Sequence, residues 1–140
     1  MDDVSPKDVD VSSVEAKRYT AFILDDNFDN RQIFRISLES VEYDVTDCAD
    51  PIEALLLLQQ RTFDLLVLDL QMPKMNGQTL LNNVRELPLH NQMHVVVVTA
   101  NPHMAVDGLV SKGDYLLYKP IDVIQFARFV ERLKQAPRVV

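Results

Sequence analysis

Short apolar runs alternate five times with segments of helical spacing along this chain, and no other feature limits its possible folds as much. Each run has the length of a buried strand, and each intervening segment repeats its apolar residues as an amphipathic helix does. That alternation predicts a parallel sheet with helices on both faces. Right-handed crossovers place the carboxyl ends of all the strands at one edge, where ligands bind in such sheets.

The expected strands are apolar or alternating in pattern. They are Tyr19–Leu24, Tyr43–Cys48, Asp64–Leu70, Val95–Val98 and Tyr115–Tyr118. The stretch Leu65–Leu68 is continuously apolar, as expected of a parallel strand covered on both faces. Four consecutive valines form the fourth strand, and β-branched side chains favour that conformation.

The expected helices have apolar residues at helical spacing. They cover Asp29–Ser40, about Asp50–Gln60, about Gln78–Glu86, Pro102–Ser111 and Ile121–Gln135. Asp50 can cap the second of these helices, and Pro51 suits its first turn. Residues 1–18 are polar and weakly periodic, so we expect a flexible tail or linker there, one domain over 19–136, and a short tail at 137–140.

The formal net charge of −7 argues against direct nucleic acid binding, which requires a basic surface. No run of about 18 apolar residues is present, and the first residues do not resemble a signal peptide. The single cysteine, Cys48, excludes an internal disulfide and has no basic neighbour to activate it. We therefore expect a cytoplasmic protein that neither binds nor crosses a membrane.

Four of the five expected strands end on residues that can take part in chemistry. The first ends on Asp25 and Asp26, the third on Asp69, the fourth on Thr99 and the fifth on Lys119. Three carboxylates at one edge of the sheet repel one another. A hard divalent cation such as Mg²⁺ offsets that repulsion with oxygen ligands, and commonly binds carboxylates together with phosphate.

This set of residues suits phosphoryl transfer, which depends on positioning and on neutralising phosphate oxygens. We expect Asp69 to accept a phosphoryl group as an acyl phosphate. Asp26 and Asp69 would bind the metal together with the backbone carbonyl of Gln71. Asp25 would hold a metal-bound water or a second coordination position.

Each residue alone has a simpler interpretation. Either member of the acid pair could cap the following helix, Thr99 could be an ordinary strand-end residue, and Lys119 could be solvated. Only their combined spacing favours a site. The three histidines, His90, His94 and His103, form no metal-ligand pattern, and we expect each at the surface.

The motifs FILDDN, DLQMPKMNG, VVVVTA and YKP, in that order, resemble the receiver domain of two-component response regulators. Asp69 lies 43 residues after Asp26, Thr99 follows it by 30 and Lys119 by 50, separations that match the family. The resemblance covers roughly 19–133. Each motif is weak alone, but four motifs in order at these spacings are a specific signal.

The resemblance implies a flavodoxin-like, chemotaxis-regulator-like fold with strand order 2-1-3-4-5 and five helices. It also implies that Asp69 is phosphorylated by a histidine kinase or a histidine phosphotransfer protein with Mg²⁺. Lys119 would contact the phosphate and precede a cis Pro120, and Thr99 would move towards the phosphate. Beyond self-transfer and slow self-dephosphorylation, no enzyme activity is implied.

In the same family, the fourth helix, the fifth strand and the last helix form the output face, through which a homodimer is possible. The family usually has Tyr or Phe three residues before the lysine, where this chain has Leu116. Tyr115 and Tyr118 flank Leu116, and we expect their side chains on the opposite face of the sheet. This departure puts the usual switch in doubt, but not the phosphorylation chemistry.

Three other functions agree with parts of this pattern. A degenerate receiver would act as a phosphorylation-independent interaction module, which Leu116 favours and the intact acids oppose. A haloacid-dehalogenase-like phosphatase also uses an aspartyl nucleophile, but it needs a second Asp where this chain has Gln71. A flavin- or nucleotide-binding domain is disfavoured, because no glycine-rich loop follows the first strand. We expect a domain that acts alone by binding partners or belongs to a longer regulator or hybrid kinase.

Overall fold

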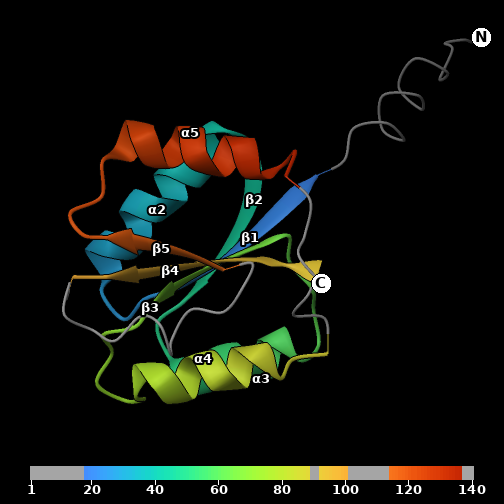
Figure 1. Ribbon diagram of the computed structural model, residues 1–140, viewed down its shortest axis with the longest axis vertical. Coiled ribbons are helices and arrows are strands. Elements are labelled where there is room, and N and C mark those ends of the chain that lie inside the picture. The colour runs from blue at the N-terminus through green and yellow to red at the C-terminus, as the bar shows by residue number, and fades with distance from the viewer. Residues whose placement is uncertain (1–17, 89–91, 101–113, 137–140) are drawn as a thin grey trace, which may run out of the picture.

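The computed structural model describes residues 18–88, 92–100 and 114–136. They form one parallel sheet in the order β2-β1-β3-β4-β5 with helices on both faces (Figure 1). The described elements are β1 (Tyr19–Leu24), α2 (Phe28–Ser40), β2 (Tyr43–Cys48), α3 (Pro51–Leu58), β3 (Leu65–Asp69), α4 (Gly77–Arg85), β4 (His94–Thr99), β5 (Asp114–Tyr118) and α5 (Val123–Leu133). The predicted fold class and strand order are confirmed.

The prediction of five helices differs slightly from the four seen in the described residues, because the expected helix at Pro102–Ser111 lies outside them. All but the last residue of the expected tail at 1–18, and the whole expected tail at 137–140, also lie outside them, so the predicted domain limits stay a prediction.

The sheet is buried at its centre and partly exposed at its edges. All five residues of β3 are buried, which explains why Leu65–Leu68 is continuously apolar. β2 and β5, the edge strands, are mostly half-buried. The carboxyl ends of β1, β3 and β4 therefore lie in the most buried part of the described sheet.

Side chains alternate across the sheet and build two hydrophobic layers. One layer lies under α3 and α4 and includes Phe22, Leu66 and Val97. The other lies under α2 and α5 and includes Ile23 and Val67. Figure 1 shows α2 and α5 together on one side of the sheet, and α3 and α4 together on the other. Burying neighbouring strand residues on opposite faces fixes the register of each strand.

Each described helix begins at a side chain that accepts a hydrogen bond from the backbone of its own first turn. The caps are Asn27 for α2, Asp50 for α3, Asn76 for α4 and Asp122 for α5. The predicted start of α3, with Asp50 as cap and proline next, is confirmed.

Two short connections constrain the backbone. Gly77, at the start of α4, lies close to Leu70: an added Cβ would lie 3.0 Å from the Leu70 carbonyl oxygen. At the opposite edge of the sheet, Glu42 has a positive φ of 69° in the turn that leads from α2 into β2. The Lys119–Pro120 peptide bond is cis, as the resemblance implied.

The predicted surface position of His94 is wrong. Its side chain is buried at the start of β4, with the ring 5.8 Å from that of Tyr115. Nε2 lies 3.2 Å from the carbonyl oxygen of Ala136, and this polar contact makes burial of the imidazole tolerable. His90 and His103 lie outside the described residues.

Among the described helices, none has both the length and the apolar character that crossing a bilayer requires.

Candidate functional site

Four strands deliver the site at the carboxyl edge of the sheet. Asp25 follows β1, Asp69 ends β3, Thr99 ends β4 and Lys119 follows β5. The first three are buried, whereas Lys119 is partly exposed and reaches Asp69 with its ammonium, whose Nζ lies 3.5 Å from Oδ2. Residues far apart in the sequence therefore meet at one place, as the alternation of elements predicted.

Three carboxylates form the core of the site. Carboxylate oxygens of Asp25, Asp26 and Asp69 all lie within 4.8 Å of one another. Asp26 is exposed, whereas the other two are buried, so the cluster opens to solvent through Asp26. This arrangement combines two fixed ligands with one accessible from outside.

Backbone N–H groups fix the two buried carboxylates. Asp25 Oδ1 accepts from the N–H of Asn27 at 2.9 Å, and Asp69 Oδ1 accepts from the N–H of Gln71 at 2.9 Å. The cap of α2 is Asn27, so the alternative that an acid of the pair caps this helix is wrong. The second oxygen of Asp69, Oδ2, faces the Lys119 ammonium, and the second oxygen of Asp25, Oδ2, is buried with no hydrogen-bond partner among the described residues.

Burial raises the pKa of Asp25 from its ordinary value of 3.8 to about 6. The hydrogen bond from Asn27 opposes this increase, the negative charge of Asp69 adds to it, and the charge of Lys119 lowers the pKa again. The lysine alone is thus not sufficient to compensate the negative charge at this edge.

The residues fit a bound Mg²⁺. The buried Asp25 Oδ2 lacks a partner, and it belongs to a cluster of three carboxylates. Hard oxygen donors of this kind are the ligands that Mg²⁺ prefers, and an open side leaves room for water and phosphate.

The side chain of Gln71 makes a contact that sequence reasoning missed. Its Oε1 accepts a hydrogen bond of 2.8 Å from the N–H of Ala100. This contact joins the loop after β3 to Ala100, the first residue after β4. No pattern in the sequence marks it, since the two residues are 29 positions apart.

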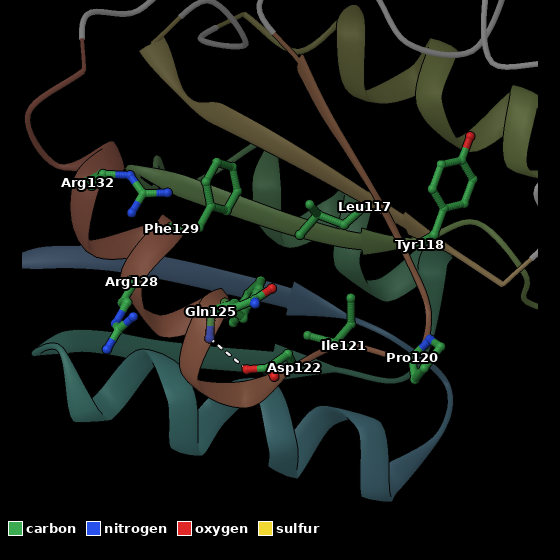
Figure 2. Close-up of a pocket in the computed structure, with 10 residues that line it drawn as sticks. Leu117, Tyr118, Pro120, Ile121, Asp122, Gln125, Arg128, Phe129 and Arg132 are labelled. Atoms are coloured by element: carbon green, nitrogen blue, oxygen red, sulfur yellow. Dashed lines mark hydrogen bonds between the residues drawn. The ribbon is translucent and has the colours of Figure 1, made fainter.

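The register of β4 and β5 corrects one expectation about the output face. Leu116 pairs with Val97 and Tyr118 pairs with Thr99, so both β5 side chains belong to one face of the sheet. Tyr115 packs into the opposite layer as predicted, but the same prediction for Tyr118 is wrong. Figure 2 shows the Tyr118 ring pointing away from α5.

A sequence profile for the response regulator receiver domain matches residues 21–131, which contain all the residues of this site. The chain belongs to the response regulator receiver domain family. The acid cluster and Lys119 therefore belong to a receiver domain of the two-component signalling type.

Relatives of this receiver domain occur alone and inside longer proteins. An uncharacterized 14.6 kDa protein of Leptolyngbya boryana is 34% identical over 112 residues, covering 79% of this chain and 86% of that protein. Sensor protein EvgS of Escherichia coli K12 is 26% identical over 138 residues, covering 92% of this chain but only 12% of EvgS. The matched unit is thus a small part of some relatives.

A solved structure shares the fold. The receiver domain of the Pseudomonas aeruginosa sensor histidine kinase PA1611 has a TM-score of 0.74 and 21% identity, covering 86% of this chain and all of that one. That structure was solved with a magnesium ion coordinated in its active-site cleft.

Proposed function

We propose that this receiver domain accepts a phosphoryl group on Asp69 from a histidine kinase or a histidine phosphotransfer protein, with Mg²⁺. The observation that carries the proposal is the position of Asp69. It is buried at the end of the central strand, with the acid pair within 4.8 Å and the Lys119 ammonium 3.5 Å away.

In the proposed reaction, a carboxylate oxygen of Asp69 attacks the phosphorus of a phosphohistidine. The new P–O bond forms as the P–N bond breaks, and the departing imidazole takes up a proton. The Lys119 ammonium neutralises negative charge on oxygens of the transferred group, and the Thr99 hydroxyl donates a hydrogen bond to one of them. Water later hydrolyses the acyl phosphate slowly, and the proposal includes no enzyme activity beyond this self-transfer and self-dephosphorylation.

Bound Mg²⁺ would supply positive charge that neutralises the phosphoryl oxygens. Asp25, Asp26, Asp69 and the backbone carbonyl of Gln71 would hold it. Asp25 would bind directly or through a water. The magnesium in the related PA1611 receiver domain and the oxygen-rich cluster here support this assignment.

The proposed partner docks beside the acceptor. A groove next to the site is lined by Asn30, Ile33, Phe34, Ala100, Lys119, Pro120 and Ile121. Ile33 is 42% exposed although it is large and apolar, so this surface has apolar area available to a partner. The similarity to sensor protein EvgS is compatible with a kinase-type partner. A cytoplasmic location is part of the same proposal.

Phosphorylation adds about −1.5 to −2 charges, which can signal only by shifting an existing equilibrium. We assign the response to the face formed by β5, α5 and the helix predicted at Pro102–Ser111. On this face Tyr118 is 45% exposed and pairs with Thr99. The proposed output is partner binding through this face, with a second copy of the chain as one possible partner and no direct contact to nucleic acid.

The test uses Mg²⁺ and acetyl phosphate, followed by intact mass measurement. We expect one added phosphoryl group in the wild-type chain and none in Asp69→Ala. The variant Asp29→Ala, which removes an exposed acid at the start of α2, should be labelled normally. Labelling that survives in Asp69→Ala would refute the assignment.

A second function, a phosphorylation-independent interaction module, is favoured by Leu116, which occupies the usual aromatic position. Under that alternative, Asp69→Ala would leave partner binding unchanged and beryllium fluoride would not alter it. Under the main proposal, beryllium fluoride changes partner binding or oligomeric state in the wild-type chain only.

A further inference from the structure

Arg31 lies behind the acid cluster, on the main-chain side of Asp25. It belongs to the first turns of α2, and its side chain is only 14% exposed. Its Nη1 donates a hydrogen bond of 2.9 Å to the backbone carbonyl oxygen of Asp25. Nothing in the phosphoryl transfer described above uses this contact.

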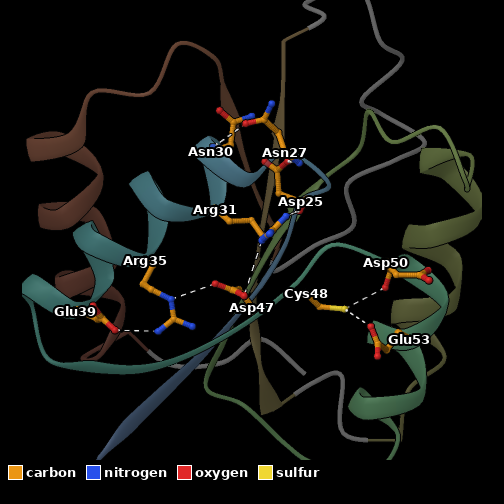
Figure 3. A network of polar contacts seen from close by, with 10 residues as sticks. All are labelled: Asp25, Asn27, Asn30, Arg31, Arg35, Glu39, Asp47, Cys48, Asp50 and Glu53. Carbon is orange, nitrogen blue, oxygen red and sulfur yellow. Dashed lines mark hydrogen bonds and ion pairs between the residues drawn. The ribbon is translucent and has the colours of Figure 1, made fainter.

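Asp47 of β2 faces the guanidinium of Arg31 from the other side and interacts with it through charge alone, because the buried Arg31 Nε has no hydrogen-bond partner among the described residues. Arg31 Nε lies 3.9 Å from Asp47 Oδ1, and Arg35 Nε donates to Asp47 Oδ2 at 3.1 Å. Figure 3 shows Arg31 between Asp25 and Asp47, with Arg35 one turn further along the same helix. Asp47 is 23% exposed, so this network is shielded from solvent compared with a surface ion pair.

The contacts of Asp25 leave its backbone little freedom. Its N–H donates to the carbonyl oxygen of Cys48 at 3.2 Å, its carbonyl accepts from Arg31, and its Oδ1 accepts from the N–H of Asn27. Only Oδ2 is left over, and it is buried without a hydrogen-bond partner among the described residues. The direction of that oxygen therefore depends on the three anchored groups.

Arg31 contacts the peptide group and not the carboxylate, so its effect differs from that of Lys119. A planar guanidinium can bridge a carbonyl and a carboxylate, which the single ammonium of lysine does less well. Groups that orient metal ligands from behind commonly change metal affinity 10- to 100-fold when they are removed.

We propose that Arg31 is a positioning residue that sets the affinity of the site for Mg²⁺, by holding the backbone of Asp25 against Asp47. The inference rests on the proposed function and adds a residue to it. It also separates two neighbouring arginines of α2. Arg31 reaches Asp25, whereas the polar partners of Arg35 within the described part of the chain are Asp47 and Glu39.

The experiment compares Arg31→Met, Arg31→Lys and the matched control Arg35→Met in the full chain. Isothermal titration with MgCl₂ alone gives the metal Kd, and labelling by acetyl phosphate gives the rate at saturating Mg²⁺. We expect Arg31→Met to weaken the Kd about tenfold while the saturated rate stays within about twofold. Arg31→Lys should recover part of the affinity. Arg35→Met removes a partner of Asp47 and leaves Arg31 in place, so it should weaken the Kd by no more than about threefold and leave the saturated rate unchanged.

Asp47→Asn provides a test that leaves Arg31 in place and removes its anchor. We expect about a threefold weaker Mg²⁺ Kd, smaller than the loss in Arg31→Met. Urea unfolding checks that each variant is folded. If Arg31→Met does not fold, Asp47→Asn decides the test.

Unchanged Mg²⁺ affinity in Arg31→Met or Asp47→Asn would overturn the inference, as would equal losses in Arg31→Met and Arg35→Met. A reduced saturated rate with an unchanged Kd would overturn it too. These outcomes concern Arg31 only. Failure of the wild-type chain to become labelled on Asp69 would instead count against the proposed function.

Discussion

Replacing Asp25 with Asn should make the metal-free protein more stable at neutral pH. The Asp25 carboxyl is completely buried, and burial raises its pKa from 3.8 to about 6. As pH rises, the unfolded state thus releases the proton of this carboxyl near pH 3.8, whereas the folded state keeps it until about pH 6. Stability is unaffected by this group below about pH 3.8, falls as pH rises to about 6, and stays lowered above that.

The size of this effect follows from the pKa values. Each pH unit between them is worth about 1.4 kcal/mol, so ionised Asp25 costs about 3 kcal/mol at pH 7.5. At pH 4.5 the cost is about 1 kcal/mol. Asn has the same shape without the charge and can keep the bond from the N–H of Asn27. We expect Asp25→Asn to gain up to about 3 kcal/mol at pH 7.5 and about a third of that at pH 4.5.

Urea unfolding followed by circular dichroism, with EDTA present, measures both values. Asp26→Asn is the matched control, because Asp26 is exposed and its replacement should change stability less. A destabilised Asp25→Asn at pH 7.5, or a gain of equal size at both pH values, would refute the reasoning. Adding Mg²⁺ at about 100 times its Kd should stabilise the wild-type chain by about 2.7 kcal/mol and Asp25→Asn much less.

Three further predictions concern the packing of the sheet, its helices and the loop before α4, each measured by urea unfolding. Tyr43→Phe removes the hydrogen bond of 2.6 Å from the phenol to the Val130 carbonyl and should cost about 1 kcal/mol; an unchanged midpoint would contradict it. Leu66→Ala leaves a cavity in a fully buried strand and should cost about 2–5 kcal/mol, whereas a loss below 1 kcal/mol would mean that the layer collapses into the space. Gly77→Ala forces a Cβ to 3.0 Å from the Leu70 carbonyl oxygen and should cost about 1–3 kcal/mol; a more stable variant would show that the loop yields freely.

The parts of the fold that local pattern controls were predictable. Strands and helices followed from apolar spacing, and the convergence of Asp25, Asp69, Thr99 and Lys119 followed from the geometry of parallel sheets. These predictions depend only on which face or end of an element a residue occupies. They required no knowledge of individual contacts.

Individual side-chain contacts could not be predicted, whether between distant or neighbouring residues. His94 is buried because it begins the buried strand β4, and the Ala136 carbonyl, 42 residues away, lies beside its ring nitrogen and makes that burial tolerable. Arg31 meets Asp25 because the first turns of α2 follow β1 closely, but a helical arginine in a sequence normally indicates a solvated surface. Such outcomes depend on tertiary distances that residue spacing does not encode.

The left-handed backbone of Glu42 has a practical consequence. A side chain at φ 69° costs about 1–2 kcal/mol that glycine would not incur, and this turn lies at the amino ends of the strands. Glu42→Gly should therefore raise the free energy of unfolding. In that background, destabilising variants of the site would stay folded and could be assayed. The acids and Lys119 lie at the carboxyl edge of the sheet, whereas this stabilising substitution lies at the amino edge.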